Sequence, residues 1–145
     1  MKERIFIVDT NVLVAGLITN DPASPTAMVL NAMLDGRLIY LLSGDLLLEY
    51  QNVLMRPRLS ELHGLQEAEI DQLLTEIAAS AIWRDPPPDK HHLSPDIGDT
   101  HLWELLASEP SAVLITGDQL LIEKPRPRSS VINPATWARQ IGGTR

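Results

Sequence analysis

Short apolar runs alternate with longer segments of helical spacing along most of the chain. Continuously apolar runs predict buried strands, which we place at 5–8, 38–42, 81–83, 112–116 and 130–132. Apolar periodicity and capping residues predict helices, which we place at 25–35, 44–55, 67–81, 99–107 and 134–142. The segment 11–18 is also mostly apolar, but Gly16 breaks it, and Pro57 stops the helix that begins at Gly44.

This alternation of short buried strands with helices predicts an α/β fold. Such strands form a parallel sheet with helices on both faces, joined by right-handed crossovers. The prolines at 86–88 form a stiff linker rather than a domain boundary. A chain of 145 residues fits one domain with a proper hydrophobic core, so we expect a single domain over residues 1–145.

Composition narrows the chemistry that this domain can perform. The chain has no cysteine, which excludes disulfides, thiolate catalysis and thiolate zinc sites. No apolar run approaches the length of a membrane helix, and the N-terminus does not resemble a signal peptide. We therefore expect a cytoplasmic protein without a membrane partner.

The net charge of −7 argues against broad electrostatic binding of nucleic acid. It argues less against a metal-dependent nuclease, because bound cations reverse the local field. The basic residues are also clustered, at Arg56 and Arg58 and again at Lys124, Arg126 and Arg128. Each cluster is interpreted either as a solvated loop or as a contact for substrate.

Acidic residues stand at the edges of several predicted elements. Asp9 and Asp118 each follow a buried run, so both are expected at the carboxyl edge of the sheet, where open α/β folds place active sites. Glu49 lies near the border of the buried face of its helix. Asp99 opens a helix, and Asp96 competes with it from three residues earlier. Carboxylates that converge repel one another unless a cation neutralises them, and oxygen ligands suit Mg²⁺ or Mn²⁺.

Each acid also has a simpler interpretation. Asp9 and Asp99 are suitable helix caps, Asp118 suits a surface turn, and Glu49 suits a solvated helix face. The chain contains no glycine-rich phosphate loop and no nucleophile elbow. The four histidines are interpreted as solvated or structural side chains rather than metal ligands: His63, His91, His92 and His101.

Taken in order, four segments resemble a PIN (PilT N-terminus) domain, and the resemblance covers nearly the whole chain. These segments run from Ile7 to Leu13, from Ser43 through Glu49 to Leu54, from Asp96 to Leu102 and from Ile115 to Leu121. The run Arg56-Pro57-Arg58 resembles the branch of toxin components of toxin–antitoxin systems. In one departure from that branch, Ile97 and Gly98 separate Asp96 from Asp99.

The resemblance implies a three-layer α/β/α fold with strand order 3-2-1-4-5, in which Asp9 and Asp118 are neighbours. It implies metal-binding roles for Asp9, Glu49, Asp99 and Asp118, with Asp96 as the other candidate for the third ligand. Supporting roles are implied for Thr10, Asn11 and Thr116. The implied function is a Mg²⁺- or Mn²⁺-dependent endoribonuclease toxin that forms a homodimer. A cognate antitoxin would bind across the acidic cleft.

Two other functions stay open from the residues alone. A phosphoryl-transfer enzyme of the haloacid dehalogenase or receiver type also carries an Asp after its first strand, but Asn11 stands where a haloacid dehalogenase has its second Asp. A non-catalytic protein-binding module would tolerate loss of an acid, whereas all four are present here. We further expect the loop of Lys124, Arg126 and Arg128 to border the metal cleft and contact substrate phosphates.

Overall fold

The structure is a computed structural model that describes residues 4–87 and 97–142. Its strands are all parallel and lie in two sheets. One sheet has the order β1 (Phe6–Val8), β4 (Val113–Ile115), β5 (Ser130–Ile132), and the other pairs β2 (Leu41–Leu42) with β3 (Ile82–Trp83). The predicted α/β class with parallel strands is therefore confirmed.

The predicted order 3-2-1-4-5 within one continuous sheet is not matched. A single parallel bridge, from Phe6 to Tyr40, links the two sheets. The Phe6 amide donates to the Ile39 carbonyl at 2.9 Å beside this bridge. The strands β2 and β3 pair over two residues, and the pairing next to β1 stays a single bridge instead of a ladder.

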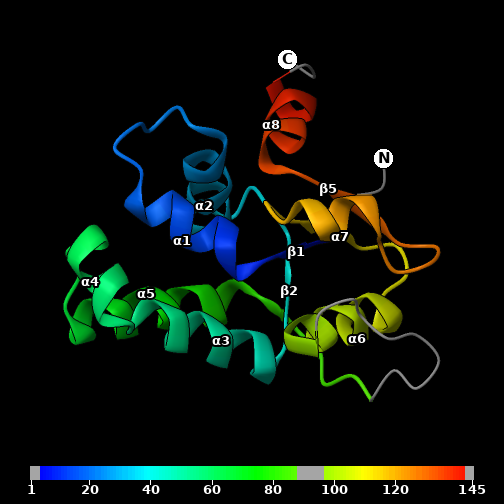
Figure 1. The fold of residues 1–145 in the computed structure, drawn as a ribbon, viewed down its shortest axis with the longest axis horizontal. Coiled ribbons are helices and arrows are strands. Elements are labelled where there is room, and N and C mark those ends of the chain that lie inside the picture. Colours follow the sequence, from blue (N-terminus) through cyan, green and yellow to red (C-terminus); the bar gives the residue numbers. More distant parts are fainter. Residues whose placement is uncertain (1–3, 88–96, 143–145) are drawn as a thin grey trace.

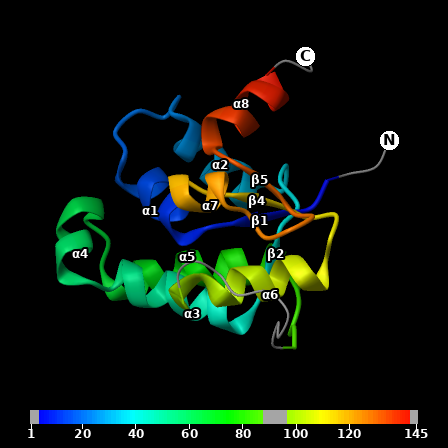
Figure 2. The ribbon, with the colours of Figure 1, turned by 45° about the vertical axis from the view of Figure 1, so that its right-hand side comes forward.

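Helices cover the strands on both sides (Figures 1 and 2). Their bounds are α1 (Thr10–Ile18), α2 (Pro25–Asp35), α3 (Gly44–Leu54), α4 (Pro57–His63), α5 (Glu67–Ser80), α6 (Thr100–Ser108), α7 (Gln119–Glu123) and α8 (Pro134–Gly142). In Figure 2, α1, α2 and α8 lie above the strands, whereas α3, α5 and α6 lie below them. The fold is thus an α/β/α arrangement, and none of the described helices is long and apolar enough to cross a membrane.

Local signals explain where several helices begin and end. Ser24 caps α2 by accepting a hydrogen bond from the Ala27 amide, and Gly36 ends it at a φ of 84°. Ser43 caps α3 in the same way through the Leu46 amide, at 3.1 Å. Pro57 follows the end of α3 and also occupies the first turn of α4. The sequence did not predict this second helix.

Gly16 does not break the first helix as the sequence suggested. The helix α1 continues through it, and a Cβ atom added there would lie only 2.7 Å from the Thr26 carbonyl oxygen on α2. Gly16 therefore lets α1 and α2 pack closely against each other at this point.

We expect Gly16→Ala to lower the free energy of unfolding by about 1–3 kcal/mol, because the backbone of α2 must move to admit the methyl group. Chemical denaturation measures this loss. Gly44→Ala is the matched control, since a Cβ atom there meets nothing within 4 Å. Equal stability of the two variants would show that α1 and α2 are not in close contact.

Candidate active site

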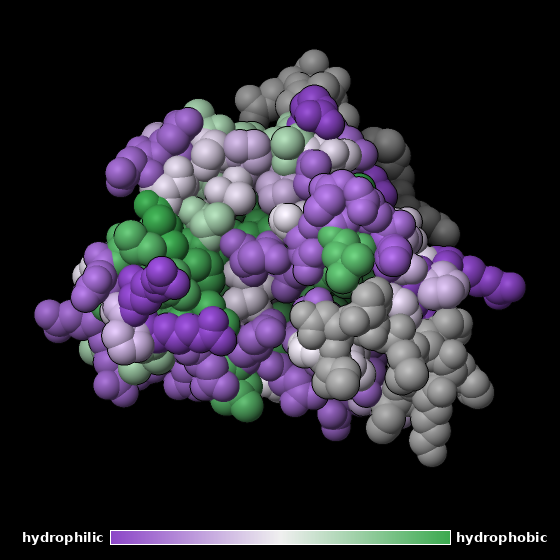
Figure 3. All heavy atoms as spheres, in the orientation of Figure 1, coloured by the Kyte–Doolittle hydropathy of each residue, from purple (hydrophilic) through white to green (hydrophobic). Residues whose placement is uncertain are grey.

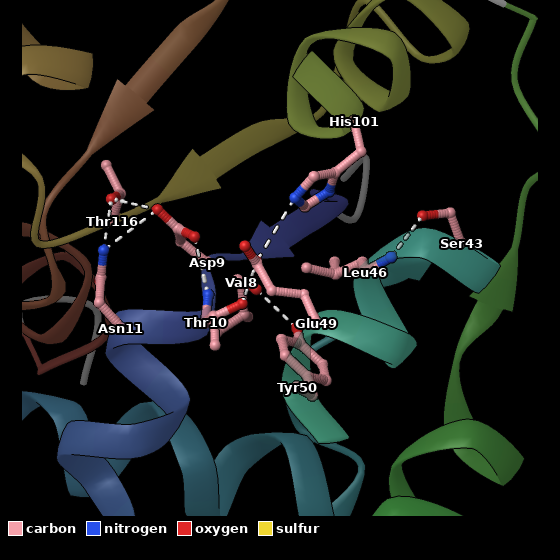
Figure 4. Close-up of polar contacts among 10 residues, drawn as sticks. All are labelled: Val8, Asp9, Thr10, Asn11, Ser43, Leu46, Glu49, Tyr50, His101 and Thr116. Carbon is pink, nitrogen blue, oxygen red and sulfur yellow. Dashed lines mark hydrogen bonds and ion pairs between the residues drawn. The ribbon is translucent and has the colours of Figure 1, made fainter. Parts of the chain in front are cut away.

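Asp9 lies where β1 ends, and it forms the centre of a polar cluster (Figure 4). It caps α1, with its Oδ1 accepting from the Thr10 amide at 2.8 Å. Its Oδ2 accepts from the Thr116 hydroxyl at 2.7 Å and from Asn11 Nδ2 at 3.2 Å. The residue is only 4% exposed, so both carboxylate oxygens are fixed by neighbours before any ligand binds.

Thr116 joins the Asp9 cluster to the turn that carries Asp118. It is fully buried after β4, and its hydroxyl accepts from the Asp118 amide at 3.0 Å while donating to Asp9. Asn11 strengthens the same link, because its Oδ1 accepts from the Gly117 amide at 2.9 Å. The parallel pairing of β1 with β4 therefore brings Asp9 and Asp118 to one edge of the sheet.

Glu49 reaches this edge from α3, on the other side of the strands. Tyr50 helps to fix this part of α3, since its buried hydroxyl donates to the Val8 carbonyl at 2.5 Å. The Thr10 hydroxyl donates a short hydrogen bond to Glu49 Oε2. Thr10 thus connects the start of α1 directly to the Glu49 carboxylate.

His101, which the sequence placed among the solvated or structural histidines, lies next to Glu49. It stands in the first turn of α6 with 13% of its side chain exposed, and its Nε2 lies 3.4 Å from Glu49 Oε2 (Figure 4). Neither of its buried ring nitrogens forms a hydrogen bond with a described residue. The sequence signal that could have placed His101 at this site is its position, two residues after Asp99 and next to the buried Leu102.

All four predicted acids line one cavity of about 700 Å³: Asp9, Glu49, Asp99 and Asp118. Thr10 and Asn11 line it as well, while Thr116 lies buried behind Asp9. Asp96 lies outside the described residues, as do His91 and His92. The described part of the chain therefore gathers the acids from three helix starts and from α3.

Burial raises the pKa of the Asp9 carboxyl above its ordinary value of 3.8, and the nearby Glu49 raises this pKa further. Hydrogen bonds from Thr116 and Thr10, together with His101, act in the opposite direction but do not cancel the effect of burial. The ionised form of Asp9 thus has a higher free energy in this cavity than in water. A cation bound there would offset that cost.

The donor set fits a hard divalent cation, because every acid offers carboxylate oxygens. Within residues 4–87 and 97–142, no three His, Asp or Glu side chains stand close enough together to form a finished metal cage. The carboxylates instead surround a shared space. Residues that would hold Mg²⁺ or Mn²⁺ there are Asp9, Asp118, Asp99 and Glu49.

Metal binding should depend on pH through Asp9. A carboxyl whose pKa is higher in the folded state favours folding at low pH, and this contribution is lost as the pH rises through the folded pKa. A cation bound beside Asp9 would therefore compete with protons for its carboxylate. We expect the rise in Tm caused by Mn²⁺ to be larger at neutral than at acidic pH, and to shrink as the pH falls through the raised pKa of Asp9.

Thermal melting with and without Mn²⁺ over this pH range measures the effect. Asp9→Asn is the control, because it removes the titrating carboxyl, and it should lose both the Mn²⁺ effect and its pH dependence. A Mn²⁺-induced shift that is constant with pH would contradict the placement of metal beside Asp9.

The basic residues singled out from the sequence differ in whether they line the acidic cavity. Arg56, just before α4, lines the acidic cavity. Arg58 is exposed on α4 and does not line it, and neither do Lys124, Arg126 and Arg128, which follow α7. In Figure 1 the loop after α7 turns away from α1 and α4. Among the Lys and Arg residues that the structure describes, Arg56 is thus the one that lines the cavity.

Comparison with known families agrees with this geometry. A family model described as PIN domain matches residues 5–120, a range that contains all four acids of the cavity. A comparison with curated proteins found no match. Since the family model spans most of the chain, the chain belongs to the PIN domain family.

Proposed function

We propose that this protein is a Mg²⁺- or Mn²⁺-dependent endoribonuclease. PIN domains are in general nucleases, which supports a nuclease-type hydrolase rather than a phosphomonoesterase of the haloacid dehalogenase type or a receiver. The observation that carries the finer proposal is the cavity into which Asp9, Glu49 and Asp118 converge together with Asp99.

A bound divalent cation would supply Lewis acidity at the phosphodiester and lower the pKa of a water molecule. The residues of the chain would do the rest. Asp9 and Asp118 would hold the ion from adjacent strand ends, and Thr116 would keep the two in register through its hydrogen bonds. Thr10 and His101 would position the Glu49 carboxylate through their contacts with its Oε2.

The proposal includes a role as the toxin of a toxin–antitoxin pair. Its support is the resemblance of Arg56-Pro57-Arg58 to that branch and the excess of acids in the cavity. An antitoxin that places an Arg or Lys among these carboxylates would neutralise them and block the substrate. A homodimer, suggested by the same resemblance, forms part of the proposal.

The test is cleavage of a 5′-labelled single-stranded RNA in the presence of Mg²⁺, Mn²⁺ or EDTA. We expect internal cleavage with either ion and none with EDTA. A DNA of the same sequence and a small phosphomonoester serve as parallel substrates. Turnover of the phosphomonoester with intact RNA would overturn the proposal in favour of the dehalogenase-type chemistry, and intact RNA under all conditions would overturn it outright.

A further inference from the structure

The cavity is larger than its metal ligands require. A water molecule occupies about 30 Å³ in the liquid, so one or two cations with their waters fill only part of the 700 Å³. The rest is lined by apolar side chains of α1 and α3: Val14, Ala15, Ile18 and Val53. Figure 3 shows an apolar surface in this region, between the positions of α1 and α4 in Figure 1, with hydrophilic residues around it.

The polarity of the cavity changes along both helices that form its walls. On α3, Val53 stands one turn after Glu49, so the two share one face. Arg56 follows the end of α3 as the N-cap of α4, and it lines the same cavity. On α1, Ala15 stands one turn after Asn11, and Ile18 stands nearly one turn further on. Each wall therefore runs from carboxylates at one end to aliphatic side chains at the other.

We propose that the apolar end is a subsite for one unpaired nucleobase, next to the phosphodiester held at the acids. This inference rests on the proposed ribonuclease function and names the form of RNA that the site takes. The flat face of a base gains from burial against aliphatic groups. Thr19 and Thr26 also line the cavity. The Thr19 hydroxyl accepts from the Asp21 amide, so it keeps its proton to donate to a base edge.

Arg56 completes the subsite. It is exposed, lines the cavity beyond Val53, and forms no ion pair with any residue in the described ranges. The carboxylates repel the phosphates of the substrate backbone. The Arg56 guanidinium, which lines the cavity beyond Val53, would attract the phosphate that follows the bound base. A base must leave its stack to enter such a pocket, and this costs least in a single strand. The preferred substrate is therefore single-stranded RNA.

The first experiment removes the base instead of the pocket. A short single-stranded RNA with one mapped cleavage site is made with an abasic residue at each position near that site in turn. An abasic residue at one position next to the cleavage site should lower kcat/KM by about 5- to 10-fold. This is the lower end of the effect of losing a base stacked on an aromatic side chain, because the wall of this pocket is aliphatic. Abasic residues further from the cleavage site should leave kcat/KM unchanged.

The second experiment fills the pocket. Ala15→Leu should raise KM for the intact RNA by about tenfold and remove the penalty of the abasic residue. The Mn²⁺-induced rise in Tm should stay unchanged, because the acids are untouched. Ala68→Leu is the matched control, since Ala68 is an exposed helix residue that does not line this cavity.

The third experiment tests the phosphate contact. Arg56→Gln should reduce the slope of log affinity against log salt by roughly 0.7, the value for one contact to a single strand. Arg58→Gln, two residues away and outside the cavity, should leave that slope unchanged.

The outcomes separate the two proposals. Metal-dependent cleavage with a flat abasic scan, and with normal kinetics in Ala15→Leu, would overturn the base subsite, keep the nuclease, and leave the apolar end to a protein partner. Failure to cleave any RNA would overturn the proposed function and the subsite with it.

Discussion

Replacing Asp9 or Asp118 with asparagine is expected to lower RNA cleavage by at least about 100-fold, since even the outer partners of metal ligands often contribute 10- to 100-fold. Both changes keep the size of the side chain. The Oδ1 of an asparagine at position 9 still accepts from the Thr10 amide and still caps α1. The loss should therefore come from the missing charge and not from unfolding.

The measurement is kcat/KM on single-stranded RNA with saturating Mn²⁺, with circular dichroism as the check on the fold. Asp71→Asn is the matched control, because Asp71 is exposed on α5 and lies outside the acidic cavity. Asp99→Asn should cause a greater loss than Asp96→Asn, since Asp99 lines the cavity. An Asp9→Asn enzyme that keeps a tenth of the activity would contradict the assignment.

Thr116→Val is expected to lower kcat/KM by about 10- to 100-fold, although no proposed metal ligand is itself substituted. Valine matches the shape of threonine but cannot donate to Asp9 Oδ2 or accept from the Asp118 amide. It also leaves the Asp118 amide without this acceptor and Asp9 Oδ2 with Asn11 as its remaining donor, so the free energy of unfolding should fall by about 1–3 kcal/mol.

Thr116→Ser separates the role of the hydroxyl from that of the methyl group. It keeps the hydroxyl and should restore most of the activity, although the lost methyl costs some stability. Steady-state kinetics together with the Mn²⁺ dependence of Tm measure both effects. A serine variant as inactive as the valine variant would show that Thr116 acts by packing alone.

Half of the site could be predicted from local signals. Asp9 and Asp118 each follow a short buried run, and parallel strands bring such positions to one edge whatever the rest of the chain does. The helix α2 was predictable in the same way, because Ser24 and Gly36 mark its ends. These features depend on neighbours in sequence, which is why pattern analysis finds them.

The remaining features depend on contacts between distant segments. His101 meets Glu49 only because α6 packs beside α3, and no spacing in the sequence encodes that packing. Gly16 has the same sequence signal whether it breaks a helix or lets one approach another. Pro57 is equally ambiguous, since a proline that ends one helix suits the first turn of the next.

The basic residues illustrate the same limit. Lys124 follows Asp118 closely in sequence, which suggested that its loop borders the cleft. The five-residue helix α7 lies between them, and the loop does not line the cavity. Arg56 lies far from Asp9 in sequence, between α3 and α4, and it does line the cavity.

The central claim is that these carboxylates bind a divalent cation. Its most direct test is anomalous diffraction at the manganese absorption edge from crystals soaked in Mn²⁺. We predict a peak inside the cavity, within coordinating distance of the carboxylates of Asp9 and Asp118, and its loss in Asp9→Asn crystals. A cavity without a peak, in crystals of protein that cleaves RNA with Mn²⁺, would contradict the claim.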